Sequence, residues 1–235
     1  MKNNIPTPEV SRFSGAPWFE QMSQMSVAIL GCGGIGSHAY FSIARLHPRI
    51  IKVVDFDNVE KVNMAGQMFE NAHLGLPKAS AMAKLGVDFS DYYDTYISCG
   101  NAQNCFLNVE GCDIIICGFD NMKSRTDIYE KWLDSYNHNN LFIDGRLTAD
   151  AFQIFCISKD NEYDVKEYRK YLFSDDEADE TPCSFKQTSY MASMIGSMIT
   201  NIVVNYAYNK TGNTDKRMIP FMLSYNSDTM YLKVK

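Results

Sequence analysis

The stretch AILGCGGIGSHAYF, residues 28–41, places four glycines between an apolar run and a segment of helical character. Gly31, Gly33 and Gly36 form the pattern GxGxxG. In a strand-to-helix connection the first glycine permits a tight turn, the second lets backbone N–H groups approach phosphate oxygens, and the third allows close helix–strand packing. Gly34 adds a further position without a side chain, and the helix N-terminus attracts an anion. The stretch therefore predicts a nucleotide-binding loop.

The chain around this loop alternates between β-branched runs and helical segments, which indicates parallel strands joined by helical crossovers. We expect an α/β fold: a Rossmann-like, mostly parallel sheet flanked by helices, with antiparallel strands at the C-terminal end. The expected strands are 26–30, 50–57, 112–120, 141–147 and 152–158, and a hairpin is expected over 218–234. The expected helices are 19–25, 38–46, 76–89, 122–138 and the strongly apolar 189–208.

The domain organisation predicted from these elements is a single nucleotide-binding domain over residues 1–235. It comprises an N-terminal helical arm (1–25), a Rossmann core (26–150) and a C-terminal extension (151–235). Within the extension, residues 159–188 are rich in charge and aromatic side chains, and we expect a long loop there.

Composition narrows the possible functions of the 235 residues. A net charge of −6 and the lack of a Lys/Arg-dense stripe argue against a nucleic-acid partner. No stretch approaches the roughly 20 apolar residues of a membrane span, and the first residues lack the apolar core of a secretory signal, so a cytoplasmic location is expected. The seven cysteines include no CxxC pair and the four histidines lie apart, so no zinc site is predicted.

Acidic and amide side chains follow the second expected strand. Asp55 stands about 20 residues beyond the glycine loop, the position from which a carboxylate accepts hydrogen bonds from ribose hydroxyls. A surface or capping role is the alternative for Asp55. Asp57, Asn63 and Gln67 come next, and Lys78 opens the following helix, where its ammonium group would neutralise a triphosphate unless it is simply solvated.

The third expected strand ends in GFDN, which supplies Asp120 and Asn121. Asp120 and Asp57 are candidate ligands for Mg²⁺, which prefers carboxylate and phosphate oxygens. Capping of the next helix is the alternative role for Asp120. Arg125, four residues after Asn121, is as easily a surface residue. A cation and a carboxylate at the phosphates favour cleavage of ATP over hydride transfer with a dinucleotide.

Four segments together, GCGGIGS, VDFDNVEKVNMAGQMF, LGLPKA and CGFDN, resemble the ThiF/MoeB/HesA family of ubiquitin-activating-enzyme-like adenylyltransferases. FIDGRLTADAFQIF, MIGSMIT and FMLSYNSDTMYLKV are similar to the second half of that family, so the resemblance covers most of residues 10–235. It implies a homodimer of Rossmann-like domains that binds ATP and Mg²⁺. It also implies adenylation of the C-terminal glycine of a ubiquitin-like or sulfur-carrier protein, with release of pyrophosphate.

The resemblance also implies roles for individual residues. Asp55 would hold the ribose, and Gly31, Gly33 and Gly34 the phosphates. Asn63, Gln67 and Lys78 would act on the triphosphate, and Asp120 would handle Mg²⁺ with Asn121 beside it. Cys183 stands where many relatives carry a thioester- or persulfide-forming cysteine, although an incidental cysteine is the alternative.

Two arginines of the family pattern are glycines in this chain, Gly15 near the N-terminus and Gly66 in the segment NMAGQ. Arg12, Arg146 and Lys186 are the candidate substitutes, because phosphoryl transfer depends strongly on such cations. Two alternatives to adenylation remain at this point. One is a catalytically weakened ATP-binding partner module of the same family, and the other is an NAD(P)-dependent oxidoreductase.

Overall fold

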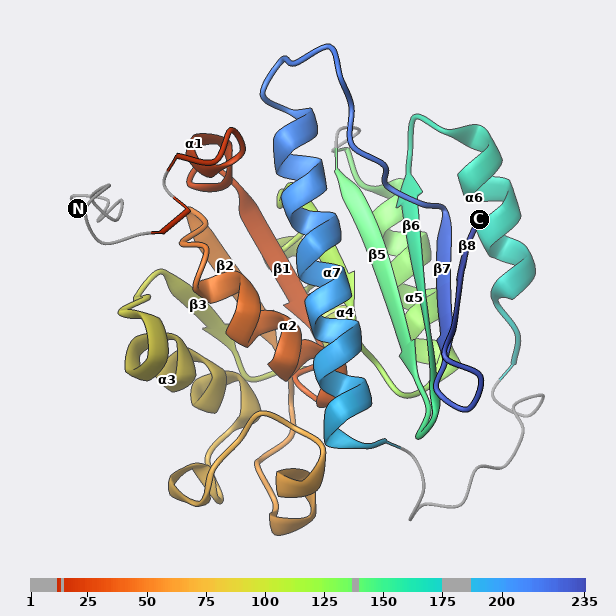
Figure 1. The fold of residues 1–235 in the computed structure, drawn as a ribbon. Helices are drawn as coiled ribbons and strands as arrows, with labels where there is room; N and C mark the ends of the chain where they lie inside the picture. The colour runs from red at the N-terminus through yellow and green to blue at the C-terminus, as the bar shows by residue number, and fades with distance from the viewer. Residues whose placement is uncertain (1–11, 14, 137–139, 175–186) are drawn as a thin grey trace.

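A single eight-stranded sheet runs through the chain in a computed structural model, which describes residues 12–13, 15–136, 140–174 and 187–235 (Figure 1). Five strands are parallel, in the order β3-β2-β1-β4-β5. They are β1 (Ser26–Leu30), β2 (Ile50–Val54), β3 (Thr95–Ser98), β4 (Ile114–Cys117) and β5 (Leu141–Leu147). β1 and β4 are buried along their whole length because helices cover both faces of the sheet.

Three antiparallel strands extend the sheet beyond β5. They are β6 (Ala151–Ser158), β7 (Met222–Asn226) and β8 (Tyr231–Val234), each paired antiparallel with its predecessor. β8 is the edge strand on this side of the sheet and is exposed along its whole length. The mostly parallel sheet with C-terminal antiparallel strands confirms the predicted fold class.

Helices cover the two faces of the sheet and divide the core in two. α2 (Gly34–Ala44), α3 (Lys78–Ser90) and α7 (Ser189–Asn209) pack on one face. α4 (Ala102–Cys105), α5 (Met122–Asp134) and α6 (Glu162–Tyr168) pack on the other. The remaining pieces are α1 (Phe19–Met22) and the short 3₁₀ turns η1 (Lys61–Ala65), η2 (Asn71–His73), η3 (Phe106–Asn108) and η4 (Arg169–Tyr171).

Two predictions about local structure were wrong. No strand was expected at β3, whose central residues Tyr96 and Ile97 are exposed and therefore show no buried-strand pattern. The loop expected over 159–188 contains α6 and η4, and α6 begins where the Asn161 side chain accepts hydrogen bonds from two backbone N–H groups. Residues 175–186 of that expected loop lie outside the described residues.

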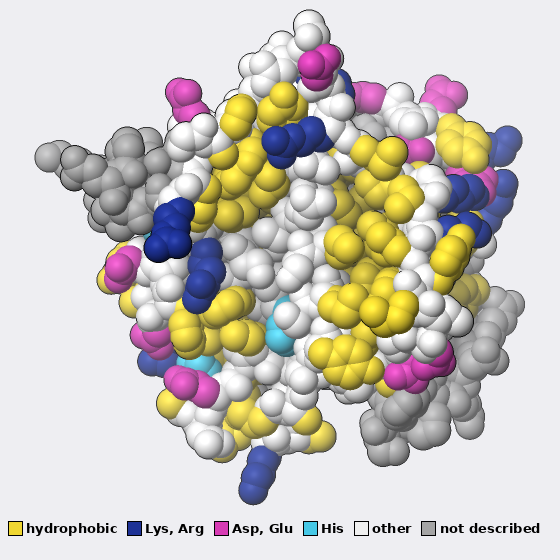
Figure 2. All heavy atoms as spheres, in the orientation of Figure 1, with side chains coloured by type: hydrophobic (Ala, Val, Ile, Leu, Met, Phe, Trp, Pro, Cys, Tyr) yellow, Lys and Arg dark blue, Asp and Glu magenta, His cyan; other side chains and the backbone are white. Residues whose placement is uncertain are grey.

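α7 is the longest described helix and lies directly against α2 (Figure 1). Gly196 makes this close approach possible, because a Cβ atom there would lie 2.7 Å from the Cβ of His38 and 2.8 Å from its backbone carbon. No described helix is both long enough and apolar enough to cross a membrane. Figure 2 shows apolar side chains gathered on both sides of α7. Leu147, Met194 and Met198 are partly buried hydrophobic residues that pack against the core on the α2, α3 and α7 face of the sheet.

The α2–α7 contact gives a prediction about stability. Gly196→Ala should lower the free energy of unfolding by about 1–3 kcal/mol, because the new methyl group overpacks the backbone of α2. Gly111→Ala is the matched control, since no atom lies within 4 Å of a Cβ there and its φ is not positive. Urea denaturation measures both variants. Equal stability of Gly196→Ala and Gly111→Ala would contradict the close contact.

Candidate functional site

The candidate site lies at the carboxyl ends of the central parallel strands. β1 is flanked by β2 on one side and by β4 on the other. β2 and β3 are therefore added on one side of β1, whereas β4 and β5 are added on the opposite side, which makes β1 a topological switch point. In open α/β sheets ligands bind in the crevice outside such a point. Gly31 follows β1, Asp55 follows β2 and Gly118 follows β4, and their backbones continue the hydrogen bonding of the strands. The elements therefore bring the glycine loop and Asp55 together.

The glycine loop is shaped by contacts that exclude side chains. Gly31 has φ +89°, and a Cβ there would lie 3.0 Å from the Gly118 oxygen. A Cβ on Gly36 would lie 1.9 Å from the Gly31 oxygen, so α2 begins in direct contact with the end of β1. Gly33 precedes α2 and supplies no side-chain cap. A Cβ atom on Gly33 would meet no atom closer than Gln67 Nε2, 4.0 Å away, so the space beside this residue is open. The free N–H groups of the first turn of α2 thus remain available to an anion.

Asp55 fixes the loop to the end of β2. The Cys32 N–H donates to one of its carboxylate oxygens (2.6 Å) and the Asp57 N–H to the other (2.7 Å). Burial raises the pKa of the Asp55 carboxyl above its ordinary value, and these two donors offset part of that effect. Each oxygen keeps a lone pair for a further donor. The Cys32 thiol beside it is fully buried and burial raises its pKa well above the usual value, so Cys32 is a packing residue.

Lys78 lies at the first position of α3 and reaches toward Asp57. Its Nζ lies 2.8 Å from an Asp57 carboxylate oxygen, and its backbone N–H donates to the Asp57 carbonyl. The Lys78 side chain is only 9% exposed, whereas that of Asp57 is 48% exposed. A well-shielded ammonium group is thus held beside an open carboxylate.

The segment after β2 carries the two candidate amides, Asn63 within η1 and Gln67 just beyond its end. Asn63 Oδ1 accepts from the Glu60 N–H (2.8 Å), so this oxygen caps η1. Gln67 points to the glycine loop, and its buried Oε1 has no hydrogen-bond partner among the described residues. Ser37 holds this segment to α2, because its hydroxyl accepts from the Met68 N–H (2.9 Å). Ser37 received no role from the sequence, although it directly follows the glycine pattern.

Asp120 and Asn121 lie between β4 and α5. Asp120 is exposed, and Asn121 Nδ2 lies 3.4 Å from its carboxylate. Asn121 Oδ1 accepts from the Ser124 N–H (2.8 Å) and caps α5. The helix cap considered for Asp120 is therefore supplied by Asn121, and the Asp120 carboxylate remains open to solvent.

Arg125 is buried, which corrects its interpretation as a surface residue. Its guanidinium donates to the fully buried Asp144 carboxylate, to the Phe119 carbonyl and to the Gly145 carbonyl. Arg125 thus connects α5, β5 and the loop that carries Asp120. Asp144 also had no assigned role, because two of its partners, Arg125 and Tyr168, are distant from it in sequence.

Arg146 does not serve as a free cation at the glycine loop, which corrects the sequence-based expectation. Its Nε lies 2.7 Å from Asp144 and its Nη1 donates to the Tyr171 carbonyl (2.9 Å). The guanidinium stacks over Phe155, on the sheet face covered by α5 and α6. Gly145, between these two residues, faces Ile35 and Ile199 on the α2 side. Arg146 and the N-terminus of α2 therefore lie on opposite faces of the sheet.

The other sequence-based candidates lie at the margins of the described chain. Arg12 is exposed in the segment before α1. Cys183 and Lys186 are outside the described residues, so their roles stay predictions.

One group of potential metal ligands does occur in the described part of the chain. Glu70, His73 and Asp88 place one ligand atom each within 4.8 Å of one another, although the sequence predicted no such cluster. The Glu70 N–H donates to His73 Nδ1 (3.2 Å), which leaves the proton of the neutral ring on Nε2. Nε2 then lacks the lone pair that a metal requires, and it lies 3.9 Å from a Glu70 carboxylate oxygen without a hydrogen-bond partner among the described residues.

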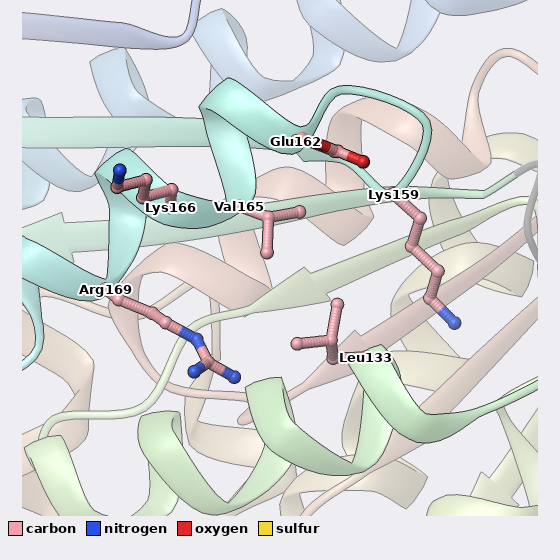
Figure 3. Close-up of a pocket in the computed structure, with 6 residues that line it drawn as sticks. All are labelled: Leu133, Lys159, Glu162, Val165, Lys166 and Arg169. Atoms are coloured by element: carbon pink, nitrogen blue, oxygen red, sulfur yellow. The ribbon is translucent and has the colours of Figure 1, made fainter.

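A cavity of about 300 Å³ lies apart from the glycine loop, between α5 and α6. Figure 3 shows Leu133 and Val165 facing each other across it, with Lys159 and Arg169 at its rim. Arg169 pairs with Glu130 (3.0 Å), and Lys159 donates to the Ser135 carbonyl (2.7 Å). These cations are used within the protein, and the cavity has no part in the candidate site.

The fold and this site define a Rossmann-like α/β protein with a glycine-rich loop at the sheet's topological switch point. The model of the ThiF family matches residues 7–234, and the chain belongs to that family.

Curated relatives share part of the sequence. The chain is 27% identical over 150 residues to tRNA threonylcarbamoyladenosine dehydratase 2 of Saccharomyces cerevisiae, a match to 59% of this chain and 30% of that protein. It is 25% identical over 137 residues to ubiquitin-like modifier-activating enzyme 5 of Bombyx mori, covering 50% of this chain and 35% of the relative. The matches thus span about a third of these relatives.

Solved structures share the fold. Escherichia coli MccB in complex with MccA superposes with a TM-score of 0.71 at 15% identity, over 93% of this chain and 65% of MccB. MccB with ATP gives a TM-score of 0.66 at 16% identity, again over 93% and 65% of the two chains.

The buried ion pairs of Asp144 with Arg125 and Arg146 give a prediction about stability. Asp144→Asn removes the carboxylate shared by two arginines and leaves both guanidinium groups with uncompensated charge, which should cost about 3–5 kcal/mol. Asp127→Asn is the control, because its pair with the exposed Lys123 contributes at most about 1 kcal/mol. Thermal denaturation followed by circular dichroism distinguishes them. A similar midpoint for both variants would show that Asp144 does not anchor this side of the site.

Proposed function

We propose that the chain is an ATP-dependent adenylyltransferase that activates the C-terminal carboxylate of a ubiquitin-like or sulfur-carrier protein. Membership of the ThiF family supports the proposal, as do the names of the relatives, which include a ubiquitin-like modifier-activating enzyme and MccB solved with ATP. The observation that carries it is the uncapped N-terminus of α2, which lies beside Asp55 and the Lys78–Asp57 pair.

The residues present fit a nucleoside triphosphate. In the proposed complex, phosphate oxygens lie over Gly33 and Gly34, where no side chain of the loop intervenes and backbone N–H groups are free. Asp55 accepts the ribose hydroxyls. Gln67 lies beside the loop with a buried, unpaired amide oxygen, and a ligand donor would recover the free energy that this atom loses by burial.

In the proposed complex, Lys78 and a magnesium ion neutralise the negative charge of the triphosphate. Lys78 is already shielded from solvent, so its attraction to a phosphate is stronger than that of an exposed lysine. We assign Mg²⁺ to the open carboxylate of Asp120, with Asn121 beside it, since Mg²⁺ prefers carboxylate and phosphate oxygens. Asn63 completes the triphosphate side of the site.

The reaction that such a site favours needs no general base. A C-terminal carboxylate has a pKa of about 3.5 and is already ionised at neutral pH. One of its oxygens attacks the α-phosphorus, the bond to the bridging oxygen breaks, and pyrophosphate leaves with the electron pair. The protein aligns these groups and stabilises the charge on phosphorus and pyrophosphate. Lysine, amides and a helix N-terminus suit that role.

Further parts of the proposal concern partners. We propose a homodimer, in keeping with the apolar side chains on the α7 face (Figure 2). Cys183 is proposed as the acceptor of an activated carrier. The catalytically weakened module stays the second candidate function, because the family's two arginines are replaced by Gly15 and Gly66.

The identity of the nucleotide is the first test. ATP with Mg²⁺ at 100 times its Kd should stabilise the chain by about 2.7 kcal/mol, a midpoint shift of roughly 5–10 °C. NAD(H) at the same concentration should give no shift. Thermal shift assays measure both ligands. Equal or greater protection by NAD(H) would overturn the proposal in favour of an oxidoreductase.

Lys78 gives the second test. Lys78→Gln should lower ATP–pyrophosphate exchange with a ubiquitin-like protein ending in Gly-Gly by about 10²- to 10³-fold, the usual effect of removing one transition-state donor. Lys84→Gln, on the exposed face of α3, is the matched control and should retain exchange. Exchange that is unaffected by Lys78→Gln would remove this residue from the mechanism. ATP binding without any exchange in the unsubstituted protein would favour the weakened module.

A further inference from the structure

Gln187, two residues before α7, lies across the N-terminus of α2. A Cβ atom on Gly34 would lie 2.2 Å from Gln187 Oε1 and 3.1 Å from its Cδ. Gly34 is the first residue of α2, so the side-chain amide of Gln187 is in contact with the part of the glycine loop that faces the proposed phosphates.

The same side chain also covers Gly66. A Cβ on Gly66 would lie 2.9 Å from Gln187 Cγ and 3.0 Å from its Nε2. Burial lowers the pKa of His38, and the nearby Gly66 backbone opposes that effect, so the His38 ring lies beside this backbone on the α2 side. A side chain at position 66 and Gln187 in its present place therefore exclude each other.

The amide of Gln187 is positioned to bind a ligand. Gln187 is half-buried, and no hydrogen bond joins its side chain to another described residue. A primary amide offers two N–H donors as well as its oxygen, and rotation of its terminal torsion exchanges their directions at little cost. An amide next to free helix N–H groups extends the same set of donors toward a phosphate oxygen.

We propose that Gln187 is a phosphate-binding residue, whose Nε2 donates to a nucleotide phosphate held over Gly33 and Gly34. The inference rests on the proposed function and adds a residue to its binding site. It also accounts for Gly66, because the absence of a side chain there is what lets Gln187 reach the loop. Gln187 supplies a neutral donor from the segment before α7, in place of a side chain at position 66.

Substitution at Gln187 tests the proposal through affinity. Gln187→Met keeps the length of the side chain but removes its donors, and Gln187→Glu places a carboxylate beside the phosphates. Isothermal titration of the full chain with ATP and Mg²⁺ should show about tenfold weaker binding for Gln187→Met, the usual value of a hydrogen bond to a charged group, and a larger loss for Gln187→Glu. Gln153→Met, on the exposed side of β6, is the matched control and should bind as the unsubstituted protein does.

Substitution at Gly66 tests the contact without nucleotide. Gly66→Ala should lower the thermal midpoint in the unsubstituted chain, where the methyl group meets Gln187. It should have a smaller effect when Gln187→Ala is also present. Equal effects in the two backgrounds would overturn the contact on which the inference depends.

The outcomes separate this inference from the proposed function. If the unsubstituted protein does not bind ATP with Mg²⁺, the proposed function fails and the inference fails with it. If it binds ATP and Gln187→Met binds equally well, the role of Gln187 alone is overturned. Tighter binding by Gln187→Met would also overturn it, because Gln187 would then be a cover over the loop rather than a phosphate ligand.

Discussion

The contact between Gly36 and the Gly31 carbonyl is the constraint on which the site depends. A Cβ at Gly36 would lie 1.9 Å from that oxygen, so α2 begins in contact with the end of β1 only because position 36 has no side chain. This approach places the first turn of α2, without a side-chain cap, at the switch point of the sheet. Asp55 then fixes the loop from β2 through the Cys32 N–H, and Ser37 fixes the segment of Gln67 and Met68 from α2.

The distribution of charge follows from a second buried anchor. Asp144 forms ion pairs with both Arg125 and Arg146, so neither guanidinium group is available at the glycine loop. Lys78 is the cation held beside Asp57 and Asp55 in the described structure, and the remaining donors around the loop are helix N–H groups and amides. A triphosphate in this site would be held mainly by one lysine, a magnesium ion and neutral donors. Such an arrangement would make the proposed nucleotide binding compatible with glycine at positions 15 and 66.

Local sequence patterns predicted the elements whose chemistry is local. The glycine loop, the buried strands, the apolar α7 and the C-terminal hairpin all carry their signal in neighbouring residues, and the fold class followed from their order. β3 was missed because its apolar residues are exposed, and α6 because its charged and aromatic residues lack a clear apolar stripe. Arg125 and Gln187 were beyond sequence reasoning, because their partners, Asp144 and Gly34 or Gly66, are brought together only by the fold.

The most direct test of the account is a crystal structure of the chain with a non-hydrolysable ATP analogue and Mg²⁺. We predict that the ribose hydroxyls lie within hydrogen-bond distance of the Asp55 carboxylate and that phosphate oxygens lie over Gly33 and Gly34, with Lys78 Nζ in contact with the triphosphate. A nucleotide bound elsewhere on the chain, or phosphates that do not contact the first turn of α2, would contradict the account.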